Sequence, residues 1–119
     1  MRDDRLRLLD IVEGIENIEK YSSGGRDAFD EDELIRIWMV HHIQIIGEAS
    51  ANLSADFRER HSEIEWARIV AMRNILIHQY FGIDWQEVWD TTVKDLPQLK
   101  TKIQSILREL EESSGPETL

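Results

Sequence analysis

The sequence contains no cysteine and only two prolines among its 119 residues. The absence of cysteine excludes disulfide scaffolds, cysteine-ligated zinc or iron–sulfur sites and thiol catalysis. With prolines only at positions 97 and 116, long helices can run uninterrupted. No apolar run approaches the roughly 18 residues that span a bilayer, and the charged start, Met1–Arg5, does not resemble a signal peptide. We therefore expect a cytoplasmic protein with no membrane partner.

Basic residues are also scarce: 14 Lys and Arg stand against 24 Asp and Glu, a formal net charge of −10. On average such a molecule repels phosphate backbones, which argues against a protein that coats nucleic acid. The segment 58–78 is the exception, because it holds four arginines, no lysine and three glutamates. Arginine suits phosphate oxygens. A local phosphate site there, or merely a solvated helix surface with ion pairs, would explain this charge.

The residues that are present favour helices, since apolar side chains recur at spacings of three and four and clean alternation is absent. The first helix has the stripe Leu8, Ile11, Val12, Ile15 and Ile18, and the last has Leu99, Ile103, Ile106, Leu107 and Leu110. We predict an all-α fold, an antiparallel bundle of four main helices plus one or two short ones. The predicted main helices cover 4–20, 30–52, 64–80 and the residues after 95, with short helices at 54–60 and after Asp84. The helical domain would span 1–111, and 112–119 would form a flexible C-terminal tail.

Helix starts are predicted from capping boxes, in which an acidic or hydroxyl side chain precedes a glutamate by three residues. Asp30 with Glu33 would start the second main helix, Ser62 with Glu65 would start the third, and Asp84 with Glu87 would cap the later short helix. The second main helix has two neighbouring apolar stripes. One comprises Leu34, Ile37, Trp38, His41 and Ile45, and the other Ile35, Met39, His42, Ile46 and Ala49. A helix that is apolar over so wide an arc is central in a bundle or faces a partner.

The run from Arg73 to Tyr80 carries most of the chemical information. Asn74 and His78 are four residues apart on one helical line, and Arg73 and Tyr80 lie on the neighbouring line. Histidine can exchange protons near neutral pH, arginine can stabilise a phosphoryl transition state, and asparagine can orient the imidazole or bind a phosphate oxygen. These groups suffice, in principle, for metal-independent RNA cleavage by attack of the ribose 2′-OH.

One copy of this helix does not bring Arg73 and His78 together on a single phosphate. Five residues separate them by about 140° around the helix and roughly 7.5 Å along it. Two copies across a two-fold axis would supply two arginines and two histidines to one cleft, which favours a homodimer with a composite site. The alternative is a buried structural histidine and an arginine paired with an acid.

The same run resembles the HEPN superfamily, and more closely the HepT-like toxin branch, whose motif is Arg, four residues, His, one residue, Tyr. Arg73, His78 and Tyr80 match this motif without a gap. The resemblance extends over nearly the whole chain. The blocks that carry it are Ile45–Ala49, Phe57–His61, Ile64–Trp66, Met72–Asn74, Tyr80–Asp84, Val88–Trp89 and Asp95–Leu99.

The resemblance implies an α-helical homodimer in which the motifs meet at the dimer cleft. It implies a metal-independent endoribonuclease without a cofactor, the toxin of a type VII-like toxin–antitoxin module, with Arg73, His78 and Asn74 as catalytic residues. The cognate antitoxin would be a nucleotidyltransferase that adds AMP to Tyr80. The expected substrate is RNA rather than DNA, with Arg58 and Arg60 as candidate phosphate-binding residues. The net charge keeps open a non-catalytic HEPN module that binds a nucleotidyltransferase or a nucleotide.

Other residues have simpler interpretations. His41 and His42, with Glu48, could suggest a metal site, but adjacent side chains diverge by about 100° on a helix, so core or interface histidines are favoured. Gly47 inside a helix suggests close helix approach near the dimer cleft. The tryptophans at 66, 85 and 89 could stack on bases, yet their spacing favours the core.

Overall fold

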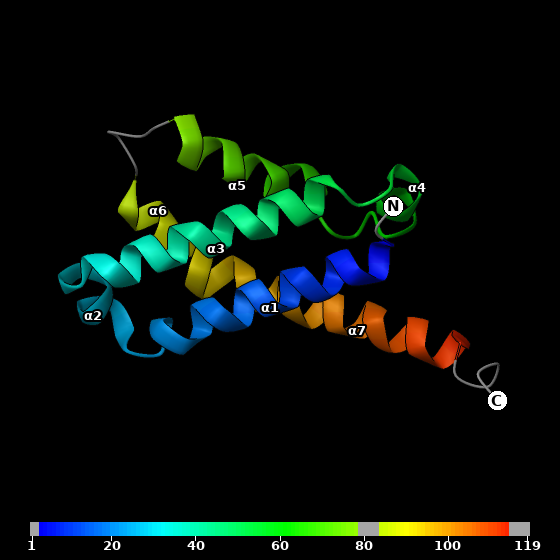
Figure 1. The fold of residues 1–119 in the computed structure, drawn as a ribbon, viewed down its shortest axis with the longest axis horizontal. Coiled ribbons are helices and arrows are strands. Elements are labelled where there is room, and N and C mark those ends of the chain that lie inside the picture. The colour runs from blue at the N-terminus through cyan, green and yellow to red at the C-terminus, as the bar shows by residue number, and fades with distance from the viewer. Residues whose placement is uncertain (1–2, 79–83, 115–119) are drawn as a thin grey trace.

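The computed structural model describes residues 3–78 and 84–114, with the backbone alone for 74–78, 113 and 114. Within these ranges the chain is helical and has no strand, which confirms the predicted all-α class (Figure 1). The elements are α1 Asp4–Ser22, α2 Gly25–Glu31, α3 Glu33–Ala51, α4 Ala55–Arg60, α5 Trp66–His78, α6 Trp85–Asp90, the π-helix η1 Thr91–Asp95 and α7 Leu96–Ser114.

The four long helices are the predicted main ones, and each lies antiparallel to the next in the order α5, α3, α1, α7 (Figure 1). The predicted apolar stripes of α1 and α7 and one of the two predicted stripes of α3 contribute to the core. From α1 the core takes Leu8, Ile11, Val12, Ile15 and Ile18, from α3 Met39 and Ile46, and from α7 Leu99, Ile103 and Ile106. Ile43 of α3 is also buried, although neither predicted stripe contained it.

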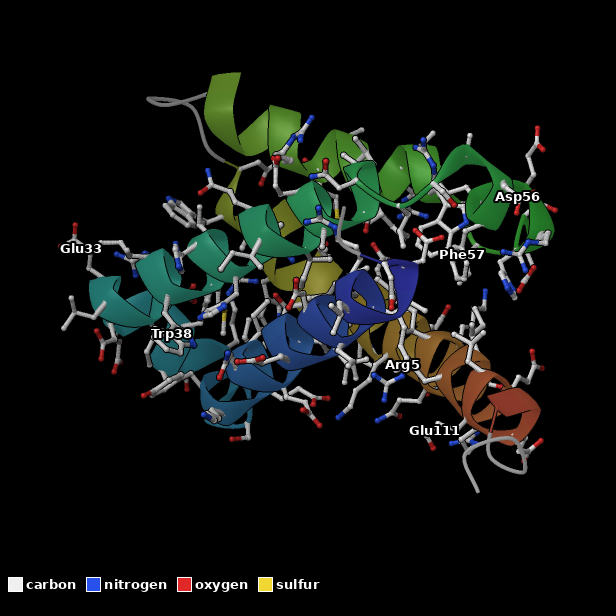
Figure 2. All side chains as sticks on the ribbon, turned by 45° about the vertical axis from the view of Figure 1, so that its right-hand side comes forward. Arg5, Glu33, Trp38, Asp56, Phe57 and Glu111 are labelled. Atoms are coloured by element: carbon white, nitrogen blue, oxygen red, sulfur yellow. The ribbon has the colours of Figure 1, made fainter. Side chains whose placement is uncertain are left out.

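The two apolar stripes of α3 have different environments. The stripe that contains Met39, Ile46 and Ala49 is buried against α1 and the rest of the core. The other stripe is exposed at Leu34 and Ile37, which are 76% and 53% exposed, whereas its Trp38 is half-buried and donates to the Asn17 carbonyl of α1 at 2.8 Å. Figure 2 shows side chains on both sides of α3, with Trp38 labelled beside α1. The exposed residues of this stripe lead along α3 toward Ile45, which lines a depression together with Arg73.

The predicted start of the second main helix at Asp30 is wrong. Asp30 belongs to α2 and pairs with Arg26 at 2.8 Å. The backbone is extended at Asp32, which is the true N-cap of α3 and accepts a hydrogen bond from the Leu34 amide at 2.9 Å. The separate helix α2 exists because Phe29 is fully buried against Trp85 and Trp89, contacts that the local sequence does not contain.

The third main helix begins at Trp66, two residues after the predicted start. Ile64 is buried in the preceding turn, and the Trp66 indole N–H donates to the His61 carbonyl at 3.0 Å. The predicted end near residue 80 lies outside the described residues.

The C-terminal third follows the predicted order with one addition. Asp84 caps α6 by accepting from the Glu87 amide at 3.1 Å, as predicted. The π-helix η1 then joins α6 to α7 and buries Thr91 and Thr92. α7 continues to Ser114, so residues 112–114 of the predicted tail are helical. None of the helices in the described ranges combines the length and hydropathy needed to cross a membrane.

Candidate active site

Helix α5 carries the arginine of the motif and packs closely on α3. The contact point is Gly47, because a Cβ placed there would lie only 2.8 Å from the Cβ of Arg73 and 3.4 Å from the Ile69 carbonyl oxygen. Real Cβ atoms do not approach so closely, so glycine is required for this helix spacing. The predicted close approach of helices at Gly47 is therefore confirmed, and it fixes the base of the Arg73 side chain against α3.

Glu48 holds the guanidinium of Arg73, although the Arg73–Tyr80 motif assigns Glu48 no role. Arg73 Nη1 donates to Glu48 Oε2 at 2.7 Å, and the two side chains are 26% and 61% exposed. Asn52 Nδ2 donates to the other carboxylate oxygen of Glu48 at 3.4 Å and to its backbone carbonyl at 2.8 Å. The hydrogen bond from Arg73, and then the charge of that guanidinium, lower the pKa of Glu48.

An open depression of about 320 Å³ lies beside this ion pair. His41, Gln44, Ile45 and Glu48 line it from one face of α3, and Arg73 lines it from α5. It therefore combines an arginine, an exposed histidine and a carboxylate at the end of an exposed apolar stripe. Such a surface can receive a phosphate group or a second protein surface.

The two adjacent histidines of α3 have different environments, although their rings lie edge-on with centroids 5.1 Å apart. His41 is exposed in the depression, whereas His42 is buried and packs edge-on against Trp38 with ring centroids 4.4 Å apart. Neither ring nitrogen of His42 has a hydrogen-bond partner among the described residues. Burial, and then the charge of His41, lower the pKa of His42, so it is a neutral core residue. In the described part of the chain no three His, Asp or Glu side chains gather as a metal site.

The other motif residues are placed by the backbone alone or lie outside the described ranges. Asn74 and His78 belong to the C-terminal half of α5, which is a continuous helix from Trp66 to His78. The five-residue separation of Arg73 and His78 therefore corresponds to the offset expected of a helix. Tyr80 lies outside the described residues.

The structure does not bring Arg58 and Arg60 to this part of α5. Both belong to α4, which lies at the end of the molecule where α5 begins, whereas Asn74 and His78 lie toward the opposite end (Figures 1 and 2). Arg60 pairs with Asp56 on its own helix at 3.1 Å, and its guanidinium lies over the Phe57 ring. On this chain the two residues are separate from the Arg73 depression.

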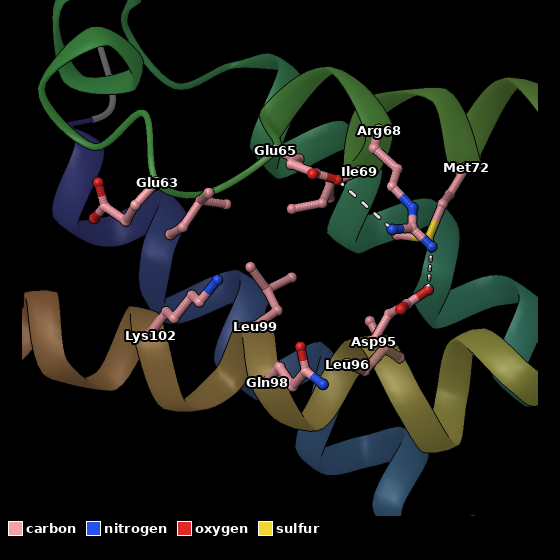
Figure 3. A pocket seen from close by; sticks show the side chains of 11 residues that line it. Glu63, Glu65, Arg68, Ile69, Met72, Asp95, Leu96, Gln98, Leu99 and Lys102 are labelled. Atoms are coloured by element: carbon pink, nitrogen blue, oxygen red, sulfur yellow. Dashed lines mark hydrogen bonds and ion pairs between the residues drawn. The ribbon is translucent and has the colours of Figure 1, made fainter.

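The other side of α5 faces α7 across a groove of about 210 Å³ (Figure 3). Ile69, Met72, Leu96 and Leu99 contribute apolar side chains to it. Arg68 of α5 pairs with Asp95, the last residue of η1, at 3.1 Å, and it also approaches Glu65 at 3.6 Å. Arg68 and Arg73 thus lie on the same helix but in different surroundings.

Comparison with known proteins agrees with the motif and the helical architecture. A family model described as "Ribonuclease HepT-like" matches residues 11–106. The chain belongs to the HepT-like ribonuclease family. Members of this family are similar to it over most of the chain. The "Probable ribonuclease HepT" of Thermococcus cleftensis is 40% identical over 103 residues, which are 83% of this chain and 91% of the relative.

A second relative has a composite name. "Gamma-glutamylcyclotransferase and putative RNase MJ0434" of Methanocaldococcus jannaschii is 38% identical over 115 residues, which are 96% of this chain. The chain spans only 52% of that relative's length. No solved structure matches the chain significantly.

Sequence reasoning missed the role of Glu48 in holding Arg73. It placed Glu48 only in a disfavoured metal site, because the two residues are 25 positions apart and on different helices. Gly47 is the sequence signal that could have indicated the role of Glu48. A glycine inside a helix marks the point at which another helix comes close, and Glu48 directly follows this glycine.

Proposed function

We propose that the chain is the endoribonuclease toxin of a type VII-like toxin–antitoxin module and cleaves RNA without a metal ion. The observation that carries the proposal is the family membership together with an intact Arg73–His78 pair on α5. The Arg73 guanidinium borders an open depression rather than the core, which is the placement that a phosphate-binding arginine needs.

The proposed reaction is an internal phosphoryl transfer. His78 takes the proton of the ribose 2′-OH, the 2′ oxygen attacks the adjacent phosphorus, and the bond from phosphorus to the 5′ oxygen breaks. The leaving 5′ oxygen takes a proton from the imidazolium of the partner subunit's His78, so the products are a 2′,3′-cyclic phosphate and a 5′-OH. Arg73 stabilises the negative charge that develops on the phosphoryl oxygens, and Asn74 orients the imidazole.

A homodimer supplies the second histidine in this proposal. The exposed apolar stripe of α3, beginning with Leu34 and Ile37, runs along the helix toward His41 and Ile45 in the depression beside Arg73. Large apolar side chains exposed in a row mark an interaction surface. A second copy that covers this stripe would bring its own motif to the same depression and complete a composite site.

The cognate antitoxin in this proposal is a nucleotidyltransferase that adds AMP to Tyr80. Tyr80 follows His78 by two residues. A bulky anionic group at that position would occupy the phosphate site and repel RNA. The support is the motif and the family, since a tyrosine stands where HepT-like toxins carry one.

A second candidate function is a non-catalytic module that binds a nucleotidyltransferase or a nucleotide. The observation that favours it is the Glu48 carboxylate on Arg73, together with the net charge of −10, because both disfavour RNA near the motif. This module would form complexes but would not cleave RNA.

Growth arrest and intact mass test the proposal in cells. Expression of the parent chain should arrest the host, and Arg73→Ala should relieve the arrest. Arg68→Ala is the matched control, because it removes an arginine from the α7 side of the same helix and should remain toxic. Co-expression with a nucleotidyltransferase encoded by an adjacent gene should increase the mass of the parent chain by AMP units, and the Tyr80→Phe variant should not gain this mass. Absence of toxicity in the parent, with complex formation intact, would favour the non-catalytic module.

A further inference from the structure

The Glu48 carboxylate contacts both the motif arginine and a second polar side chain, Asn52. Both of its oxygens are engaged, by Arg73 Nη1 at 2.7 Å and by Asn52 Nδ2 at 3.4 Å. Asn52 also donates to the Glu48 backbone carbonyl at 2.8 Å, which ties its amide to the last turn of α3. The carboxylate is therefore oriented from within its own helix before it meets α5.

Arg73 is correspondingly fixed at two points. Gly47 allows the base of its side chain to lie directly against α3, and Glu48, the next residue, holds one terminal nitrogen of the guanidinium. A long side chain fixed at both ends loses the rotamer freedom that would otherwise oppose productive binding. Consecutive residues of α3 thus determine where the guanidinium lies.

The contact leaves the guanidinium able to bind a phosphate. Arginine has five N–H donors in a fixed plane, and the hydrogen bond to Glu48 uses one of them. The depression that Arg73 and Glu48 share is open, so an incoming phosphate can reach the guanidinium while Glu48 still holds it. The geometry fits a support for Arg73 better than a block.

We propose that Glu48 is a positioning residue of the ribonuclease site, whose carboxylate fixes the Arg73 guanidinium in the orientation that meets the scissile phosphate. This proposal rests on the proposed ribonuclease function and names a residue outside the motif. Glu48 does not touch the reacting atoms; it acts through Arg73. Asn52 orients Glu48 in turn.

The main alternative is an ion pair with a purely structural role. Arg68 and Asp95 provide the comparison, because Arg68 lies on the same helix as Arg73 and pairs with Asp95 of η1 at a similar distance, 3.1 Å, but on the side that faces α7 (Figure 3). Loss of either acidic partner removes one negative charge and one ion pair of α5. Of these two losses, only the loss of Glu48 should change catalysis.

Steady-state kinetics on the full chain with a single-stranded RNA substrate test the proposal. Glu48→Ala should lower kcat by about 10- to 100-fold, by analogy with the loss when residues that orient metal ligands are removed, while KM changes by less than about threefold. Glu48→Gln, whose amide oxygen can still accept from Arg73, should recover part of that loss. Asp95→Asn should leave kcat within about twofold of the parent.

Thermal unfolding followed by circular dichroism accompanies these measurements and shows whether each variant is folded. If Glu48→Ala does not fold, the comparison of Glu48→Gln with Asp95→Asn carries the test, because both replace a carboxylate by its amide. A kcat of Glu48→Gln lower than that of Asp95→Asn, at equal stability, supports the proposal.

Three outcomes would overturn the proposal. If folded Glu48 variants keep the parent kcat, or exceed it, the carboxylate does not position Arg73. If Asp95→Asn loses as much kcat as the Glu48 variants, the loss reflects the packing of α5. Both results leave the ribonuclease function standing. If the parent chain cleaves no RNA, the proposed function fails, and the role of Glu48 fails with it.

Discussion

At the scale of single residues, Gly47 determines how closely α5 approaches α3. A Cβ at this position would lie 2.8 Å from the Arg73 Cβ, an atom that cannot move without its helix. Gly47→Ala should therefore separate the helices. Overpacking costs about 1–3 kcal/mol, and the higher helix propensity of alanine offsets about 1 kcal/mol of that. We expect a net loss of about 1 kcal/mol in the free energy of unfolding, measured by urea denaturation.

Gly14→Ala is the control for this prediction. Its added Cβ would meet Ile46 Cγ1 at 3.0 Å, a contact that needs a shift of only a few tenths of an ångström and does not involve another helix's Cβ. It should therefore destabilise the chain less than Gly47→Ala does. A Gly47→Ala variant at least as stable as the parent would show that the helices do not need this close contact.

His42 makes the stability of the chain depend on pH. Burial lowers the pKa of its imidazole in the folded chain, with His41 and Lys20 acting in the same direction and Glu13 against it. The unfolded state therefore binds a proton more readily than the folded state near the ordinary histidine pKa of 6.5. Stability contributed by neutral His42 should be present above that pH and should decrease as the pH falls.

Denaturation by urea at pH 7.5 and at pH 5 checks this prediction. The parent should lose more free energy of unfolding between the two pH values than His42→Leu, which keeps an apolar side chain of similar size and cannot be protonated. Equal losses in the two proteins would contradict a buried neutral imidazole at this position.

At the scale of elements, the start of α3 separates what the local sequence predicts from what packing decides. Asp32 caps α3 through the Leu34 amide, whereas Asp30 pairs with Arg26 on the surface of α2. Asp32→Ala should cost about 1 kcal/mol of unfolding free energy, the usual effect of a lost N-cap. Asp30→Ala should cost less than about 0.5 kcal/mol. Chemical denaturation measures the loss in each variant. If Asp30→Ala destabilised the chain more than Asp32→Ala does, the result would favour a helix that starts at Asp30, as the sequence predicted.

The outward stripe of α3 is the element that a second copy would cover. Ile37→Glu should give a folded monomer, because it places a charge in the centre of that surface. Val93→Glu is the matched control, since Val93 is a branched apolar residue, 42% exposed, on η1. Light scattering coupled to gel filtration should show a dimer for the parent and Val93→Glu. A dimeric Ile37→Glu variant would exclude this stripe as the interface.

Periodicity and local capping were sufficient to predict much of the fold. The stripe from Leu8 to Ile18 and the Asp84 cap are local patterns, and both are confirmed. The helix α2 was missed because it depends on Phe29 packing against tryptophans more than 50 residues away. The Glu48–Arg73 contact was missed for the same kind of reason, since it depends on the register between α3 and α5.

At the scale of the whole molecule, the net charge of −10 coexists with a site proposed to bind RNA. Carboxylates pair with several of the basic groups, among them Arg68 with Asp95, Arg73 with Glu48 and Lys100 with Glu19. The charge thus argues against a protein that coats nucleic acid, and is compatible with one that cuts RNA where a few cationic groups gather. The catalytic claim therefore depends on Arg73 and His78 rather than on a broad basic surface.

Cleavage of RNA by the purified chain in the presence of EDTA tests that claim most directly, with the new ends identified by mass spectrometry. The account predicts cleavage by the parent, with 2′,3′-cyclic phosphate or its hydrolysis product and 5′-OH ends, and none by a folded His78→Ala variant. Cleavage by His78→Ala at the parent rate, or an unmodified parent that leaves RNA intact, would contradict it.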